Sequence, residues 1–170
     1  IYSTIIGTPS TSLPGASSGV LKVEDGFVYL SGITSVTSYP TTAGAYRGDL
    51  SEGSSALYVT KLNKTGTDLI YSTFLGEGAV FMLGDMAVEN GFVYLSGTTY
   101  DEFPTTANAY QESFSDGGKI FLFNDPETGE PFEDFDPPIL GDLSNPADAF
   151  VTKLAVDGGS LVYSTYLGGA

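Results

Sequence analysis

The chain of 170 residues contains no cysteine, no histidine and no tryptophan. Because cysteine is absent, the chain forms no disulfide and offers neither a thiolate nucleophile nor a cysteine ligand for zinc. The absence of histidine removes the commonest general base and the commonest transition-metal ligand, and it excludes a Ser-His-Asp triad. We therefore expect a protein that is not an enzyme and that requires no cofactor.

Positive charge and long apolar runs are scarce as well. Six Lys and Arg residues face 21 Asp and Glu residues, which gives a formal net charge of −15 at pH 7. Such a chain repels a phosphate backbone, so we expect no nucleic-acid partner. No apolar run approaches the roughly 20 residues that cross a bilayer, so we expect no membrane insertion. The sequence starts at Ile1 without a visible signal peptide, which indicates a processed product or an excerpt of a longer chain.

What the chain does contain is a tandem repeat, which has to be recognised before any local pattern is interpreted. Three phrases occur twice in the same order: VEDGFVYLSG (23–32) and VENGFVYLSG (88–97), YPTTAGAY (39–46) and FPTTANAY (103–110), and YVTKLNKTGTDLIYSTFLG (58–76) and FVTKLAVDGGSLVYSTYLG (150–168). The end of the last phrase has a third copy, IYSTIIG, at residues 1–7. We therefore divide the chain into an extra segment, 1–7, and two units, 8–76 and 77–170, of which the second carries an insertion at about 113–145.

Each unit has the pattern of an antiparallel β-meander. Asp25-Gly26 and Asn90-Gly91 sit between apolar runs, and such pairs favour the positive φ angles of a type I′ hairpin turn. No segment has a helical period. Both faces of the FVYL strands are apolar, which suggests sheets that are covered on both sides. Strands are expected at about 20–23, 27–31, 57–62 and 69–75, with counterparts in the second unit.

These patterns predict an all-β fold of two four-stranded antiparallel, propeller-like blades, with one extra N-terminal strand and an irregular acidic insertion. Sandwich sheets give a similar pattern, but a tandem repeat of four strands favours blades.

The recurring phrases resemble a known repeat. LVYSTYLGG, the GFVYLSG hairpin, FPTTANAYQ and DAFVTKL are together similar to the bacterial and archaeal β-propeller repeat often called SBBP, over nearly all of the chain outside Ser113 to Asn145. The stretch EGAVFMLGDMAV and the acidic insertion depart from the usual pattern of that repeat. The resemblance implies a secreted or cell-surface protein, often a module of a long chain, and it implies no enzyme activity and no shared catalytic residues.

Two blades do not close a propeller, since closed rings typically have about 4 to 8. Open blade faces and strand edges recruit partners or aggregate. Three outcomes stay open: an excerpt of a longer propeller, a ring closed by several copies, or a head-to-tail filament. In the last two, the extra strand could add to the sheet of a neighbour, or it could be an edge strand of its own molecule. The residues of this candidate assembly strand are Ile1, Tyr2, Ser3, Thr4, Ile5, Ile6 and Gly7.

The insertion concentrates negative charge. Ten acidic residues lie between Glu112 and Asp148, opposed only by Lys119. Oxygen ligands of this kind suit a structural Ca²⁺ ion, although their spacing differs from that of an EF-hand. The alternatives are a solvated acidic loop, docking onto a basic partner, and a glycosidase pair formed by Glu133 and Asp136. The candidate calcium ligands are Asp125, Glu127, Glu130, Glu133, Asp134 and Asp136.

Two further features concern ligands and modification. Four tyrosines flank the two PTT loops, where aromatic rings either stack on sugars or pack the loop against its own blade: Tyr39, Tyr46, Tyr100 and Tyr110. Asn63-Lys64-Thr65 is a glycosylation sequon on an expected turn, which would suit a secreted protein.

The sequence thus predicts a non-catalytic extracellular or cell-surface protein with an architectural role. We expect a self-assembling subunit or module of a prokaryotic surface filament, sheath or adhesin, whose partners are other copies of itself or further repeats of a longer chain. The alternative is a fragment of a closed propeller that presents its loops to a glycan or a protein.

Overall fold

A computed structural model describes residue 3, residues 19–114 and residues 147–168. These residues form eight strands and no helix, in two four-stranded antiparallel sheets, so the expected all-β fold is confirmed. The first sheet has the order β1 (Val20–Glu24), β2 (Phe27–Thr34), β3 (Ala56–Leu62), β4 (Leu69–Leu75). The second has the order β5 (Val80–Glu89), β6 (Phe92–Thr99), β7 (Asp148–Leu154), β8 (Leu161–Leu167). Within the described ranges, no helix is long and apolar enough to span a membrane.

The hairpin turns that the sequence predicts are present. Asp25 and Gly26 have φ angles of 50° and 82°, and Asn90 and Gly91 have angles of 53° and 80°. Two consecutive positive φ angles are what a two-residue type I′ turn requires. These turns fix the pairing of β1 with β2 and of β5 with β6, because a two-residue loop leaves no freedom in the register.

Strand β5 is longer than its counterpart β1. It has 10 residues against 5, and its pairing with β6 shifts register twice, between Val80 and Met82 and between Leu83 and Asp85. Extra residues of this kind make bulges, which increase the local twist of a strand. The stretch that departs from the repeat pattern therefore forms a long irregular strand, which lies against β1 of the first sheet.

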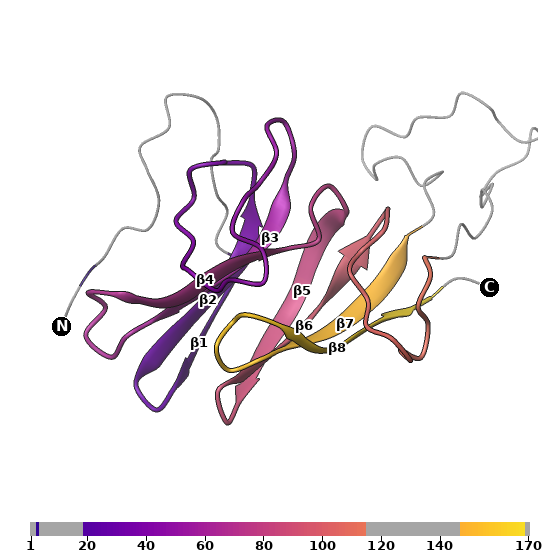
Figure 1. The fold of residues 1–170 in the computed structure, drawn as a ribbon. Helices are drawn as coiled ribbons and strands as arrows, with labels where there is room; N and C mark the ends of the chain where they lie inside the picture. Colours follow the sequence, from indigo (N-terminus) through magenta and orange to yellow (C-terminus); the bar gives the residue numbers. More distant parts are fainter. Residues whose placement is uncertain (1–2, 4–18, 115–146, 169–170) are drawn as a thin grey trace, which may run out of the picture.

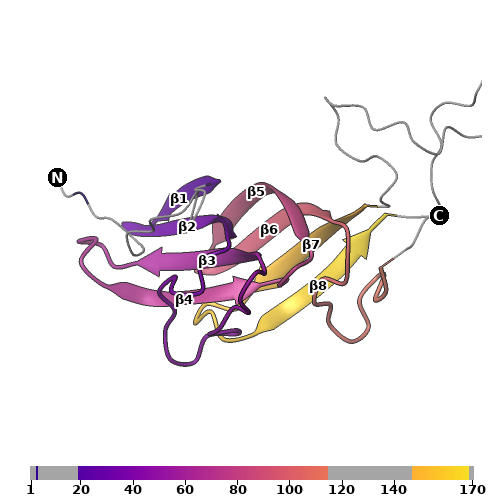
Figure 2. The same cartoon turned by 90° about the horizontal axis from the view of Figure 1, so that it is seen from above.

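The two sheets pack against one another through the main core, and β1 and β5 lie side by side where they meet (Figure 1). Figure 2 shows the same arrangement from above, with β4 and β8 at the opposite ends of the sheets from β1 and β5. The buried residues of this core are Tyr29, Leu57, Val59, Tyr71, Leu75, Val80, Met86, Val93, Leu95, Phe103, Phe150, Leu154 and Tyr166.

A second, smaller core lies on the other face of the first sheet. The loop between β2 and β3 folds back over this face, so that Tyr39 and Leu50 pack against Tyr58 and Phe74. The rings of Tyr39 and Tyr58 are 4.5 Å apart between centroids. Part of this sheet face is therefore covered by its own unit.

Several sequence predictions fall outside the described residues. Of the candidate strand at residues 1–7 only Ser3 is described, and it is exposed. The insertion is described up to Phe114 and again from Ala147, so the six candidate calcium ligands and the Glu133–Asp136 pair also lie outside.

Candidate functional site: the junction between the two sheets

The contact between the two sheets, which we call the junction, is the most extensive feature that the repeats build together. Successive side chains of a strand point to opposite faces. From the first sheet, Tyr29, Tyr71 and Leu75 point toward the second, where they pack with Met86 and Tyr166. The junction thus joins two different faces: one face of the first unit and the opposite face of the second.

The repeat makes it possible to compare one position in two surroundings. Leu75 lies in the junction and is 0% exposed, whereas its counterpart Leu167, on the far face of the second sheet, is 46% exposed. Tyr71 is 2% exposed and its counterpart Tyr163 is 40% exposed. The chemistry of the two copies is the same, so the difference arises from the sheet that covers one of them.

The opposite face shows the same relation in reverse. Met86 points into the junction and is 1% exposed, whereas its counterpart Leu21, on the far face of the first sheet, is 57% exposed. Ile70 and its counterpart Val162 behave differently, since both are 49% exposed. The exposure of that position is the same in the two units, so it serves as an internal control.

We call the uncovered part of the first sheet, with Leu21 and Val23, the leading face. We call the uncovered face of the second sheet, with Tyr163 and Leu167, the trailing face. Val23 is 62% exposed, and Met82 on the trailing face is 54% exposed. In the junction, a trailing-type face of the first unit packs against a leading-type face of the second.

Polar contacts fix the register of the junction. The Glu24 carboxylate accepts hydrogen bonds from the backbone amides of Asn90 and Gly91, each at 2.8 Å. Lys22 forms an ion pair with Asp85 at 3.3 Å. The pKa of Asp85 is lowered by a hydrogen bond from the Met86 amide and, to a smaller extent, by Lys22.

A glycine allows a close approach between the two units at the junction. Gly158, in the turn between β7 and β8, has a φ of 73°, and a Cβ at this position would overlap the ring of Tyr71. The amide of Tyr46 donates to the Gly158 carbonyl at 2.9 Å. The turn of the second unit is thus held between a ring and a loop of the first.

The repeated PTT and YST phrases bond to one another within each unit. Thr42 Oγ1 accepts from the Ser72 amide at 3.0 Å, and Thr106 Oγ1 accepts from the Ser164 amide at 3.1 Å. Thr73 Oγ1 likewise accepts from the Arg47 amide. The phrases therefore recur together because each loop is fastened to the last strand of its own sheet.

Of the four tyrosines considered for ligand binding, Tyr39 is buried and its hydroxyl is 3.0 Å from Thr60 Oγ1. Burial raises the pKa of this phenol. Tyr39 thus packs against Tyr58 and Phe74 of its own unit. Tyr100 is half-buried, while Tyr46 and Tyr110 are 38% and 87% exposed.

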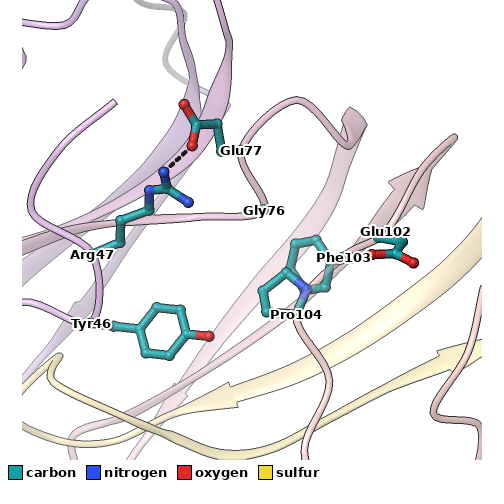
Figure 3. Close-up of a pocket in the computed structure, with 7 residues that line it drawn as sticks. All are labelled: Tyr46, Arg47, Gly76, Glu77, Glu102, Phe103 and Pro104. Atoms are coloured by element: carbon teal, nitrogen blue, oxygen red, sulfur yellow. Dashed lines mark ion pairs between the residues drawn. The ribbon is translucent and has the colours of Figure 1, made fainter. Parts of the chain in front are cut away.

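A pocket of about 260 Å³ lies where the junction reaches the surface. Figure 3 shows Tyr46, Arg47 and Glu77 facing it from the first unit and Phe103 and Pro104 from the second. Arg47 forms an ion pair with Glu77, and hydrogen bonds from Ser51, with a smaller effect of Arg47, hold the pKa of Glu77 low. The complete lining is Tyr46, Arg47, Gly76, Glu77, Glu102, Phe103 and Pro104.

The remaining predicted sites stay predictions. Asn63 lies on the expected turn, where its side-chain amide donates to Asp68 Oδ2 at 2.7 Å and its Oδ1 accepts from the Thr67 amide at 3.0 Å. A glycan on Asn63 would leave Nδ2 with one hydrogen, so that only one of its two hydrogen bonds, to Asp68 Oδ2 or to Thr67 Oγ1, would remain. No cluster of three or more potential metal ligands is present within residues 19–114 and 147–168.

Sequence reasoning missed the junction contacts. Glu24 and Glu89 each precede a predicted hairpin turn, and this shared position was the only local sign of the carboxylate contact. No family model matches the chain, and comparison with curated proteins and with solved structures finds no significant match either.

Proposed function

We propose that this protein is a non-catalytic structural module that assembles by stacking further sheets of the same kind on its two uncovered faces. The partners are other copies of the chain or further repeats of a longer chain. The observation that carries the proposal is the exposure of Leu167 and Leu21, whose counterparts Leu75 and Met86 are fully covered inside the junction.

The stacking that we propose is head to tail. The leading and trailing faces are different surfaces, and the junction pairs one type with the other. A contact between unlike patches is heterologous, and it produces a ring if the rotation closes and a filament if it does not. The setting that we propose is a prokaryotic surface filament, sheath or adhesin. The apolar faces support the assembly itself, because large exposed apolar patches mark surfaces that bind a partner.

Sedimentation velocity over a wide range of protein concentration tests the proposal. We expect self-association that becomes stronger with added salt, because copies with a net charge of −15 repel one another and salt screens that repulsion. Leu167→Asp should abolish the association, since it places a charge in the contact. Ile70→Asp is the matched control and should associate like the unmodified protein. A protein that stays monomeric at every concentration and salt level would refute the proposal.

A second candidate function is glycan binding at the junction pocket, as in a binding module built from propeller repeats. It is favoured by the Tyr46 ring at the pocket, next to the hydrogen-bonding groups of Arg47, Glu77 and Glu102. Arg47 and Glu77 neutralise one another, so Glu102 leaves the pocket negative, which suits neutral sugars better than anionic ones. Saturation-transfer NMR with a panel of neutral saccharides tests this function. Saturation-transfer signals that persist in Tyr46→Ala would exclude this pocket as the saccharide-binding site.

A further inference from the structure

The turn at Asn90-Gly91 acts as an anion site inside the junction. Both residues have positive φ, so their backbone amides converge on one side of the turn, and the Glu24 carboxylate of the preceding unit binds both of them. Successive amides in this arrangement form a concave site for an anion. A hydrogen bond to a charged acceptor is stronger than a neutral one, so this contact both stabilises and orients the junction.

The chain contains a second glutamate and a second turn of the same kind. The second glutamate belongs to the second sheet and the second turn to the first sheet, so they do not meet within one molecule. Glu89 is the counterpart of Glu24, occupies the same place before its turn, and is exposed at the end of β5. The turn at Asp25-Gly26 has nearly the same φ angles as the turn at Asn90-Gly91. Among the described residues, neither the Asp25 nor the Gly26 amide donates a hydrogen bond to a partner within the molecule.

We infer that Glu89 of one copy binds the Asp25 and Gly26 amides of the next copy, and that this contact sets the direction and register of stacking. The inference rests on the proposed function and adds to it the pair of surfaces that must meet. The partner is a second copy, because the occupant of the equivalent turn inside the chain is the equivalent glutamate of the neighbouring unit.

The charges beside the outer turn favour an incoming carboxylate. The Lys64 stem runs along Gly26, since a Cβ there would lie 3.5 Å from Lys64 Cδ, and its Nζ is 5.0 Å from the centroid of the Phe27 ring. The counterpart of Lys64 in the second unit is Val156. The outer turn thus has a cation that the inner turn lacks, and this cation offsets the charge of Asp25, which replaces the neutral Asn90.

The Lys22–Asp85 ion pair of the junction has no counterpart on the outer faces, because both of the equivalent positions carry uncharged residues. Ala87 stands in the place of Lys22, and Val20 stands in the place of Asp85. In a second copy stacked in the same way, neither of these two positions would carry a charge. Neither face is left with an unpaired charge, which would oppose the contact.

The energetic part of the test compares two single substitutions by sedimentation equilibrium. Glu89→Gln should weaken self-association about tenfold, because it removes the charge that strengthens both bonds. Glu52→Gln is the control, since it removes one negative charge from an exposed loop and should leave association unchanged or slightly strengthened. Equal association of the two variants would overturn the inference.

The geometric part uses the absence of cysteine, which makes single introduced thiols selective. A mixture of Glu89→Cys and Asp25→Cys proteins, treated with a short thiol cross-linker, should give a mixed dimer. Each variant alone should give little product. Dimers from Glu89→Cys alone would indicate like-with-like packing and would overturn the inference.

The experiments distinguish a failure of the Glu89 contact from a failure of the stacking proposal. If the unmodified protein associates and Leu167→Asp does not, but Glu89→Gln associates normally and no mixed dimer forms, the glutamate contact is wrong and the stacking proposal stands. If the unmodified protein never associates, both are wrong.

Discussion

Two buried tyrosines show how the contribution of a hydroxyl group to stability depends on its hydrogen-bond partners. The Tyr166 hydroxyl accepts from the Phe103 amide at 2.5 Å and donates to the Phe103 carbonyl at 2.9 Å, which fastens the loop of the second unit to β8. Among the described side chains, the Tyr71 hydroxyl is the one buried polar group that has no hydrogen-bond partner. The same hydroxyl group therefore stabilises the fold at one position and destabilises it at the other.

Replacement by phenylalanine should have opposite effects at these two positions. Tyr166→Phe should lower the free energy of unfolding by about 2 kcal/mol, because it leaves the Phe103 amide unpaired. Tyr71→Phe should be neutral or should raise it by up to about 1 kcal/mol, because it removes an unpaired hydroxyl. Urea unfolding at neutral pH measures both, and a clear loss of stability in Tyr71→Phe would contradict the assignment.

Tyr71 should also contribute to the loss of stability in alkali. Burial raises the pKa of its phenol, so the folded state keeps the proton at a pH where the unfolded state releases it. The contribution is fully present below about pH 10, the pKa of an unperturbed phenol, and is lost as the pH rises further. Tyr71→Phe should therefore lose less stability between pH 7 and alkaline pH than the unmodified protein does in the same urea titrations.

Glycine at position 158 should matter because of its neighbour as well as its φ. Gly158→Ala places a methyl group against the Tyr71 ring and should cost about 3 kcal/mol, as strain of the left-handed backbone adds to overlap. Gly53 has a similar φ of 81° with nothing near its Cβ position, so Gly53→Ala should cost about 1 kcal/mol. Thermal unfolding measures both losses of stability. Equal losses would contradict the prediction, because they would mean that the Tyr71 ring moves aside for the added methyl group at little cost.

At the scale of the strands, two side chains at the same position of the repeat can contribute differently to the free energy of unfolding. Leu75 and Leu167 close the same phrase, but only Leu75 is covered. Leu75→Ala should cost about 3 kcal/mol in the monomer, whereas Leu167→Ala should cost less than about 1 kcal/mol. Urea unfolding at a concentration that keeps the protein monomeric checks this, and similar losses would show that the trailing face is covered within one molecule.

Much of the fold follows from local patterns in the sequence. The turns at Asp25-Gly26 and Asn90-Gly91 have strong local preferences, and the alternation of FVYL is that of a strand, so both were predicted correctly. The length and bulges of β5 were not predicted, because the register of its irregular part depends on its packing against the first sheet.

The site was harder to predict than the fold. Apolar residues on both faces of a strand indicate that both can be covered, but they do not say which face another part of the same chain covers. Nor does the sequence place Glu24 beside a turn 66 residues away, since that contact exists only once the sheets have stacked. Both facts depend on the arrangement of whole sheets in space.

At the scale of the whole molecule, the chain contains one junction and two outer sheet faces, the leading face and the trailing face. Inside the junction, a trailing-type face meets a leading-type face, and among the described residues each outer face exposes apolar side chains such as Leu21 and Leu167. This asymmetry allows the two faces to be blocked one at a time. Leu21→Asp should disable only the leading face, and Leu167→Asp should disable only the trailing face.

The most direct measurement is therefore sedimentation velocity of these two variants, alone and mixed in equal amounts. Neither variant should associate alone, because each lacks one of the two required faces. The mixture should form dimers of one copy of each and nothing larger, since the remaining faces of such a dimer are both blocked. Self-association of either variant alone, or a mixture that stays monomeric while the unmodified protein associates, would contradict head-to-tail stacking.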